Sequence, residues 1–286
     1  MKKIFCNFFF LTLLFWVLFP VPVYAWNMTG HTIIAQIAFD HLTDKAKQQI
    51  NYLLGAESDD QRSNKILSAS IWPDLIKKDD VHAFDHWHFI DIPFSVDQTP
   101  LPSIAKENVV WAINQSILVV ASPRASHYEK KLFLRFLIHF VGDITQPLHC
   151  ATRVSKQYPK GDAGGVLFPI MSMQWPSLHS FWDAGAGYFS QQIGNDHHLR
   201  FWQIRLLADA IQKKYPETYF GSQLSDMNPA AWAQQSFTIA KTFAYDTTPG
   251  AMLSPTYIAH AQQLSQQQIA LAGYRLANLL NLIFSK

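Results

Sequence analysis

Apolar residues recur at helical spacing over most of this chain. The pattern is clear near the start, where five apolar side chains form one stripe of a helix: Ile33, Ile34, Ile37, Ala38 and Leu42. Few stretches alternate between apolar and polar residues for four or more positions, so a central sheet is not predicted. The pattern indicates an all-α fold.

Local start and stop signals bound the predicted helices. Thr43 and Gly55 bracket one helix, and prolines that follow Asn228 and Ser254 open two others behind a capping side chain. The predicted helices are residues 32–42, 43–54, 103–121, 129–145, 229–244 and 255–284. A chain of this length can bury one substantial core, so we expect one helical domain over residues 26–286.

The first 25 residues have the order of a secretory signal. Lys2 and Lys3 precede the apolar run 8–19, and Ala25 offers a small residue for cleavage. The alternative is a retained membrane anchor, but the run is shorter than the roughly 20 residues that span a bilayer. We expect a cleaved signal peptide at residues 1–25, no stable anchor, and an exported protein, periplasmic or secreted.

Charge and cysteine content narrow the possible functions. The formal net charge of the whole chain is +2, and removal of Lys2 and Lys3 would leave a neutral protein. A neutral protein has no general surface for polyanions, so an anionic substrate must be held locally. Cys6 would leave with the leader, so no internal disulfide is expected. Cys150 is predicted to be a small buried side chain rather than a metal ligand.

Histidine and aspartate recur in pairs four residues apart. His139 with Asp143, and His179 with Asp183, would each point to one face of a helix. One such pair alone could satisfy itself at the edge of a core. Four further candidates accompany the two pairs: Asp74, His88, Asp91 and His149. Imidazole and carboxylate groups in this number favour a zinc site, since no cysteine set competes for the role.

The predicted cleavage would add an unusual ligand. Trp26 would become the first residue, and its amino nitrogen and carbonyl oxygen could chelate a metal ion together. His31 follows five positions later. Residues 161–165 form a glycine-rich loop that could bring backbone close to such a site, although a plain surface turn is an alternative.

At these motifs the chain resembles the zinc-dependent S1/P1 nucleases, which are related in fold to zinc-dependent phospholipases C. The resemblance spans residues 26–286 and rests on these pieces: Trp26 with His31, Trp72-x-Asp74, Trp87-His88-Phe-Ile-Asp91, His139-Phe-x-Gly-Asp143-Ile-x-Gln-Pro-Leu-His149, Gly161-Asp-x-Gly-Gly165 and Leu178-His-x-x-Trp-Asp183. It implies a single-domain helical bundle.

The resemblance also implies three zinc ions. Their ligands would be Asp74, His88, His139 and Asp143 for one ion; His149, His179 and Asp183 for a second; and Trp26 with His31 and a shared Asp143 for the third. Asp91 matches a carboxylate that sits beside the attacking water in relatives. The implied enzyme is a monomeric endonuclease that hydrolyses single-stranded DNA and RNA to 5′-phosphates. 3′-Nucleotides are expected as further substrates.

Three positions depart from the family pattern. Thr145 stands where a histidine is frequent, and Ser177 and Val166 replace frequent asparagines. None of these is an expected metal ligand. Residue 166 belongs to a loop thought to face the nucleobase, so the departures concern base recognition.

Two other functions are compatible with a zinc site. In zinc-dependent phospholipases C the N-terminal Trp lies further from the first His ligand, and the last carboxylate is typically Glu. The five-residue spacing to His31 and the presence of Asp183 favour the nuclease. A non-catalytic exported zinc-binding protein is the second alternative, and Asp91 argues against it because a structural site gains nothing from a spare carboxylate.

Overall fold

The fold was analysed in a computed structural model, which describes residues 26–55, 65–189 and 201–285. The predicted signal peptide lies outside these residues. The helices are α1 (Met28–Asp40), α2 (Asp44–Leu54), α3 (Lys65–Leu75), α4 (Val109–Ala121), α5 (His127–Asp143), α6 (Leu178–Asp183), α8 (Phe201–Lys214), α9 (Glu217–Phe220), α10 (Pro229–Ile239) and α11 (Pro255–Ile283). The all-α prediction is confirmed.

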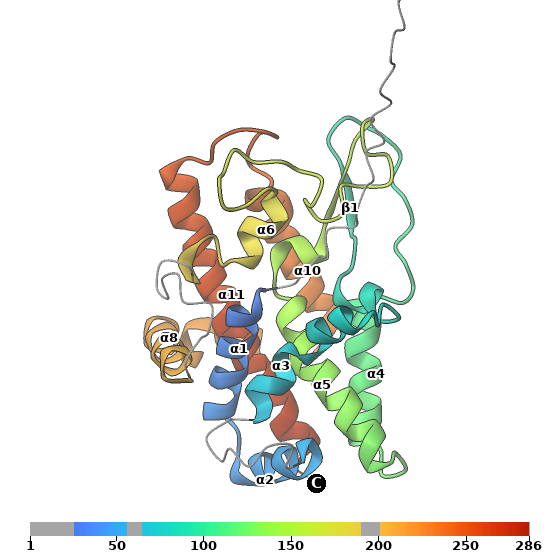
Figure 1. Cartoon of the computed structure of the whole chain (residues 1–286), viewed down its shortest axis with the longest axis vertical. Helices are drawn as coiled ribbons and strands as arrows, with labels where there is room; N and C mark the ends of the chain where they lie inside the picture. Colours follow the sequence, from blue (N-terminus) through green and yellow to red (C-terminus); the bar gives the residue numbers. More distant parts are fainter. Residues whose placement is uncertain (1–25, 56–64, 190–200, 286) are drawn as a thin grey trace, which may run out of the picture.

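The long helices form a bundle at one end of the molecule (Figure 1). Helix α1 packs against α3, α8 and α11, and α5 packs against α3 and α4. Helices α1 and α11 approach closely at Gly273, where a Cβ atom would lie 2.5 Å from Cγ2 of Ile37. No helix among the described residues combines the length and apolar character needed to cross a bilayer.

Loops and a small parallel sheet occupy the other end of the molecule (Figure 1). Strand β1 (Pro93–Ser95) pairs with β2 (Thr152–Val154), with Pro93 opposite Thr152. Three short 3₁₀ turns precede the strands in sequence: η1 (Ile76–Asp79) and η2 (Asp85–His88) lie between α3 and β1, and η3 (Pro147–Cys150) lies between α5 and β2. The sheet is peripheral, as the hydrophobic pattern indicated.

Capping explains where the helices begin. Thr43 accepts a hydrogen bond from the Ala46 amide and Ser254 from the Tyr257 amide, so the predicted starts of α2 and α11 are confirmed. The predicted start at residue 103 is wrong. Asn108 Oδ1 accepts from the amides of Val110 and Trp111, and α4 therefore begins at Val109.

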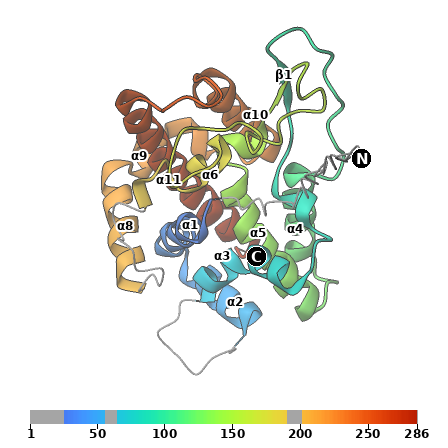
Figure 2. The ribbon, with the colours of Figure 1, turned by 45° about the horizontal axis from the view of Figure 1, so that its top comes forward.

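Helices α3, α8 and α9 lie outside the helix ranges predicted from the sequence. Helix α3 contains Pro73 near its C-terminal end, which a sequence-based rule takes as a stop signal. Helix α8 follows a gap in the described residues. With the loop end tilted toward the viewer, α1, α3, α5 and α6 gather around the centre of the molecule (Figure 2).

Candidate metal centre

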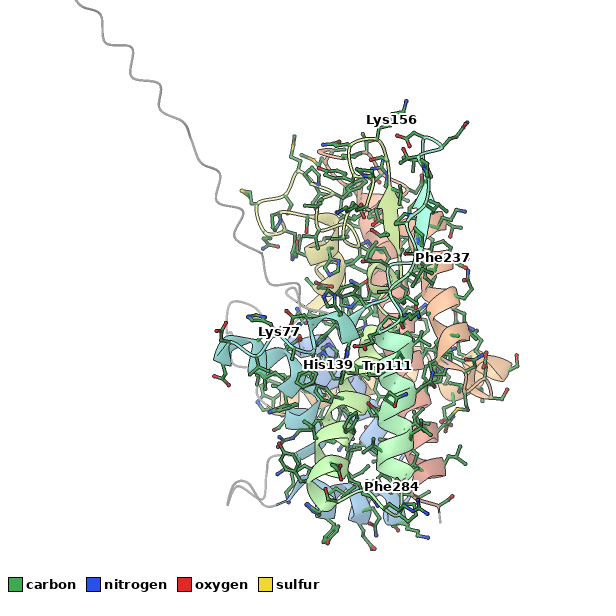
Figure 3. All side chains as sticks on the ribbon, turned by 90° about the vertical axis from the view of Figure 1, so that its right-hand side faces the viewer. Lys77, Trp111, His139, Lys156, Phe237 and Phe284 are labelled. Atoms are coloured by element: carbon green, nitrogen blue, oxygen red, sulfur yellow. The ribbon has the colours of Figure 1, made fainter. Side chains whose placement is uncertain are left out.

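The His and Asp residues proposed as ligands come from six elements and converge in the interior. His31 lies on α1, and His139 and Asp143 lie on α5. The others lie on shorter elements: Asp74 on α3, His88 on η2, His149 on η3, and His179 with Asp183 on α6. All eight are at most 7% exposed. His139 lies at mid-height in the molecule, between the bundle and the loop end (Figure 3).

Four of these side chains form a first group around His139. The Nε2 atom of His139 lies 3.1 Å from Nδ1 of His88, and Asp143 Oδ2 lies 2.9 Å from the His88 atom and 3.3 Å from the His139 atom. Asp74 Oδ1 lies 3.8 Å from both imidazole nitrogens. Ligands of a tetrahedral zinc ion with bonds of about 2.0–2.1 Å stand about 3.3 Å apart. The spacing of the first group therefore fits such an ion.

A second group forms where α6 meets η3. His179 Nε2 lies 3.3 Å from Asp183 Oδ2, and His149 Nε2 lies 3.9 Å from Asp183 Oδ1. The N-cap of α6 is Ser177, whose hydroxyl accepts a hydrogen bond from the Ser180 amide. Serine caps a helix as well as the asparagine that it replaces, so this departure leaves the placement of His179 intact.

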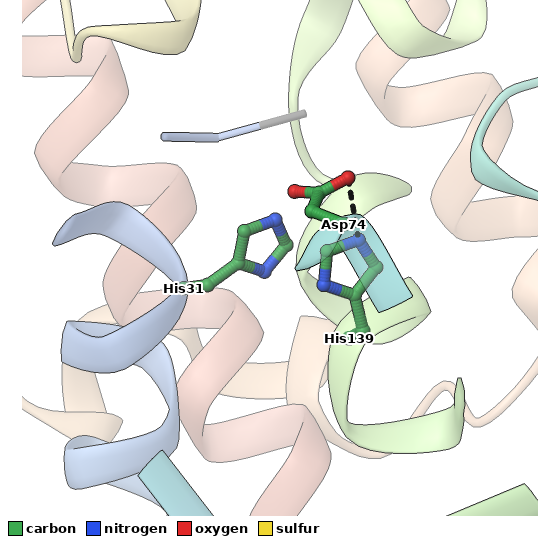
Figure 4. Close-up of side chains that lie close together, drawn as sticks. All are labelled: His31, Asp74 and His139. Atoms are coloured by element: carbon green, nitrogen blue, oxygen red, sulfur yellow. Dashed lines mark ion pairs between the residues drawn. The ribbon is translucent and has the colours of Figure 1, made fainter. Parts of the chain in front are cut away.

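His31 connects the first group to the start of α1 (Figure 4). Its ring stacks on His139 with 3.9 Å between the centroids, and its Nε2 lies 3.1 Å from Asp143 Oδ1. One ligand atom each from His31, Asp74 and His139 lie within 4.8 Å of one another. Asp143 thus directs one oxygen to His31 and the other to the first group.

Trp26 is placed beside both groups. Its side chain is fully buried and donates from Nε1 to Thr145 Oγ1 at 3.3 Å. The next amide, that of Asn27, donates to the carbonyl of Asp183 at 2.9 Å. The backbone of Trp26 is therefore anchored at the end of α6, and Thr145 serves to hold the Trp26 ring.

The hydrogen bonds of the imidazoles fit metal ligation. His139, His149 and His179 each use Nδ1 toward a backbone carbonyl, at 2.6, 2.9 and 2.8 Å respectively. Within the described part of the chain, no hydrogen bond reaches Nε2 of His149 or Nδ1 of His31, although both atoms are buried. A metal-bound imidazole usually has its second nitrogen fixed in this way, which leaves the other for the ion.

Burial also keeps several imidazoles neutral. Desolvation lowers the pKa of His31 and His149, and it lowers the pKa of His88 to about 4. Desolvation acts in the same direction on His139, but Asp143 and Asp74 outweigh it and raise the pKa of His139. A neutral imidazole has a lone pair for a metal ion, whereas a protonated one must first release its proton.

The pKa values of two carboxylates in the site are shifted in opposite directions. Burial disfavours the charge of Asp143, yet His139 and the other imidazoles hold its pKa well below the usual value. Burial raises the pKa of Asp183 well above the usual value, and the charges of Asp74 and Asp143 add to the rise. A cation among these carboxylates would offset both the burial and the mutual repulsion.

Two residues at the site were missed by the sequence analysis. Lys77 on η1 places Nζ 3.0 Å from Asp74 Oδ1, and its side chain is 9% exposed. Gln146 donates from Nε2 to Asp183 Oδ1 at 2.6 Å. Lys77 lies three residues after Asp74, so an i, i+3 search would have found it, whereas Gln146 contacts a carboxylate 37 residues away and has no local signal.

Asp91 lies outside the three His/Asp groups. It lines a small cavity of about 130 Å³ together with Phe89, His86 and Lys160. Burial raises the pKa of Asp91 to about 6, and the charge of Asp162 acts in the same direction. His86 is exposed, whereas Asp91 is half-buried.

The glycine-rich loop 161–165 is not a plain surface turn. Gly164 has φ +61°, and a Cβ atom there would lie 2.4 Å from the carbonyl oxygen of Leu148. Its own carbonyl accepts the hydrogen bond from Nδ1 of His179. Cys150 is buried nearby and donates from Sγ to the Ile144 carbonyl at 3.3 Å, as expected for a small packed side chain.

Comparison with known proteins places these features in a family. The model of the S1/P1 nuclease family matches residues 26–285. Nuclease P1 of Penicillium citrinum is 26% identical over 90% of this chain and 97% of its own length. Nuclease S1 of Aspergillus oryzae is 25% identical over 92% of this chain and 93% of its own length. Endonuclease 4 of Arabidopsis thaliana is 25% identical over 91% of this chain and 89% of its own length. The chain therefore belongs to the S1/P1 nuclease family, and it is a hydrolase that cleaves phosphodiester bonds.

Proposed function

We propose that the protein is an exported, zinc-dependent endonuclease that hydrolyses single-stranded DNA and RNA and leaves 5′-phosphates. 3′-Nucleotides are proposed as additional substrates. The observation that carries this proposal is the convergence of buried His and Asp ligand atoms at the spacing of a tetrahedral zinc ion. We propose that the protein acts as a monomer.

Three zinc ions fit the donor set. The proposed ligands are the first group for one ion, the second group for another, and Trp26 with His31 and Asp143 for the third. The anchored backbone of Trp26 and the 3.1 Å separation between His31 and Asp143 support the third site. The family match also begins at Trp26, the residue that cleavage of the predicted signal peptide would expose.

Charge explains why such a site would bind a phosphodiester. Three zinc ions would carry six positive charges, and the carboxylates of Asp74, Asp143 and Asp183 would neutralise three of them. Lys77 adds a cation beside Asp74. The rest of the chain is nearly neutral, so the local excess is the main attraction for a phosphate.

The chemistry divides between the ions and the chain. Bound zinc polarises phosphoryl oxygens and lowers the pKa of water. Lys77 is placed to stabilise negative charge on a phosphate near Asp74. We propose Asp91 as the catalytic carboxylate that accepts and releases a proton, which a pKa near neutrality would favour.

Single strands are the proposed substrate because the site is recessed. All proposed His and Asp ligands are at most 7% exposed, so a phosphate must enter the molecule to reach them. A stiff duplex cannot bend one phosphate into such a site, and a paired base cannot leave its stack at no cost.

Cleavage should be much slower on duplex than on single strands. We expect a difference of at least about tenfold, because breaking one stacked base-pair step costs about 1.4 kcal/mol. The measurement compares one oligonucleotide alone and annealed to its complement at matched ionic strength. A hairpin of the same composition is the control and should be cut in its loop. Equal rates on all three substrates would contradict the proposal.

Maturation should be needed for full metal content. A version of the protein that retains one Met before Trp26 cannot offer the free amino nitrogen. It should bind one zinc ion fewer and turn over much more slowly than a version that begins at Trp26. Removal of the extra Met by an aminopeptidase is the matched control and should restore both. Equal zinc content before and after removal would refute the N-terminal ligand.

Asp143→Asn should be the most damaging single change to the metal centre. The substitution keeps the shape but removes the charge that faces both His31 and His139. We expect loss of at least one zinc ion and a lower unfolding temperature, measured by metal analysis and calorimetry. Asp209→Asn, on the half-exposed side of α8, is the control and should change neither. Retention of every ion at normal activity would show that Asp143 does not bridge two metals.

Asp91→Asn should separate catalysis from metal binding. The variant should keep its zinc because Asp91 lies outside the three His/Asp groups. A lost acid–base group lowers kcat by about 100-fold or more. A raised KM with an unchanged kcat would instead assign Asp91 to substrate binding and contradict its catalytic role.

A further inference from the structure

Three imidazoles of the candidate metal centre each contact a backbone carbonyl through Nδ1, and these carbonyls belong to different kinds of structure. The Nδ1 atom of His139 is held by the carbonyl of Ser70, within α3, and that of His149 by the carbonyl of His88, within η2. The Nδ1 atom of His179 is held by the carbonyl of Gly164, which belongs to the irregular loop 155–177. No helix or strand fixes that carbonyl, so its position depends on other contacts of the loop.

Asp162 supplies the side-chain contacts of the glycine pair, while the Gly165 carbonyl accepts a hydrogen bond from the His179 amide at 3.3 Å. The Asp162 side chain is 1% exposed, and its Oδ1 atom accepts three hydrogen bonds: from the Arg153 amide at 3.0 Å, the Gly165 amide at 3.1 Å and the Tyr245 hydroxyl at 2.8 Å. The first donor lies on β2 and the last follows α10. Asp162 therefore ties the loop to β2, just before it in sequence, and to Tyr245, which is 83 residues away.

Tyr245 reaches the loop from the end of a π-helical turn, η5 (Ala240–Ala244). Its ring packs against Phe94 and Phe168, with centroids 5.1 and 5.7 Å away. A Cβ atom added to Gly165 would lie 3.5 Å from the Tyr245 hydroxyl, so the hydroxyl stands directly beside the glycine pair. The aromatic contacts fix the ring, and the ring in turn fixes the hydroxyl toward Asp162.

We propose that Asp162 and Tyr245 are positioning residues for His179. Through the backbone of Gly164 and Gly165 they hold the carbonyl that orients the imidazole toward Asp183. Loss of either anchor lets this carbonyl move and weakens the second group as a metal site. The proposal rests on the zinc site of the proposed function, and it adds residues that touch neither metal nor substrate.

The test compares zinc retention in tyrosine variants across a series of chelator concentrations. Tyr245→Phe removes one hydroxyl and keeps the ring between Phe94 and Phe168. Tyr274→Phe is the matched control, because that buried hydroxyl donates to the Tyr215 carbonyl at 3.0 Å, far from the loop in sequence. Tyr245→Phe should release one zinc ion at a chelator concentration about tenfold lower than the wild-type protein requires. Tyr274→Phe should release it at the same concentration as the wild-type protein.

Substitutions of Asp162 separate positioning from general stability. Asp162→Ala removes the acceptor and should weaken the same single ion at least as much as Tyr245→Phe. Asp162→Asn keeps an oxygen for the two backbone amides and the hydroxyl, so it should restore most of the retention. The visible spectrum of the Co²⁺-substituted protein should change in the Ala variant and be close to wild type in the Asn variant.

Two outcomes would overturn the inference for different reasons. If Tyr245→Phe and Asp162→Ala lower the unfolding temperature but release zinc like the Tyr274→Phe control, the positioning role is overturned while the zinc site stands. If His179→Ala keeps as much zinc as wild type, the metal site itself is wrong and the inference falls with it. Should Asp162→Ala not fold, the tyrosine pair alone decides.

Discussion

The structure depends on how three buried carboxylates are neutralised. Asp74, Asp143 and Asp183 are all withdrawn from solvent, and the last two are the final residues of α5 and α6. The C-terminal end of a helix carries partial negative charge, so a carboxylate there is unfavourable unless a cation offsets it. The neighbouring groups are mainly imidazoles that burial tends to keep neutral. Positive charge between them would therefore stabilise the fold as well as serve the proposed chemistry.

The remaining architecture can be understood as a means of bringing these groups together. Helix α5 contributes two of them four residues apart, and α6 repeats the arrangement with His179 and Asp183. Helix α1 adds His31, which stacks on His139 and faces Asp143. Because the ligands come from separate elements, packing of the long helices sets the spacing within the first group. The loop end of the molecule sets the spacing within the second.

The two groups therefore differ in the backbone that holds their imidazoles. In the first group, the imidazole of His139 is held by a carbonyl within a helix. In the second, the imidazole of His179 is held by a loop that Asp162 fastens. The cavity that contains Asp91 and Phe89 also borders Lys160, which lies in the same loop. Changes in the loop can therefore alter the second group and this cavity without disturbing the core of the bundle.

The sequence by itself determined most of the long helices and most of the candidate chemistry. Capping residues located α2, α10 and α11, and the i, i+4 pairs predicted which His and Asp share a helix face, because both signals act within one or two turns. Tertiary structure alone decided which pairs meet, as between His88 and His139, which are 51 residues apart. It also decided the contact between Asp162 and Tyr245, across 83 residues. Such contacts have no local signal, because their geometry is set by helix packing and loop anchoring rather than by the neighbouring residues.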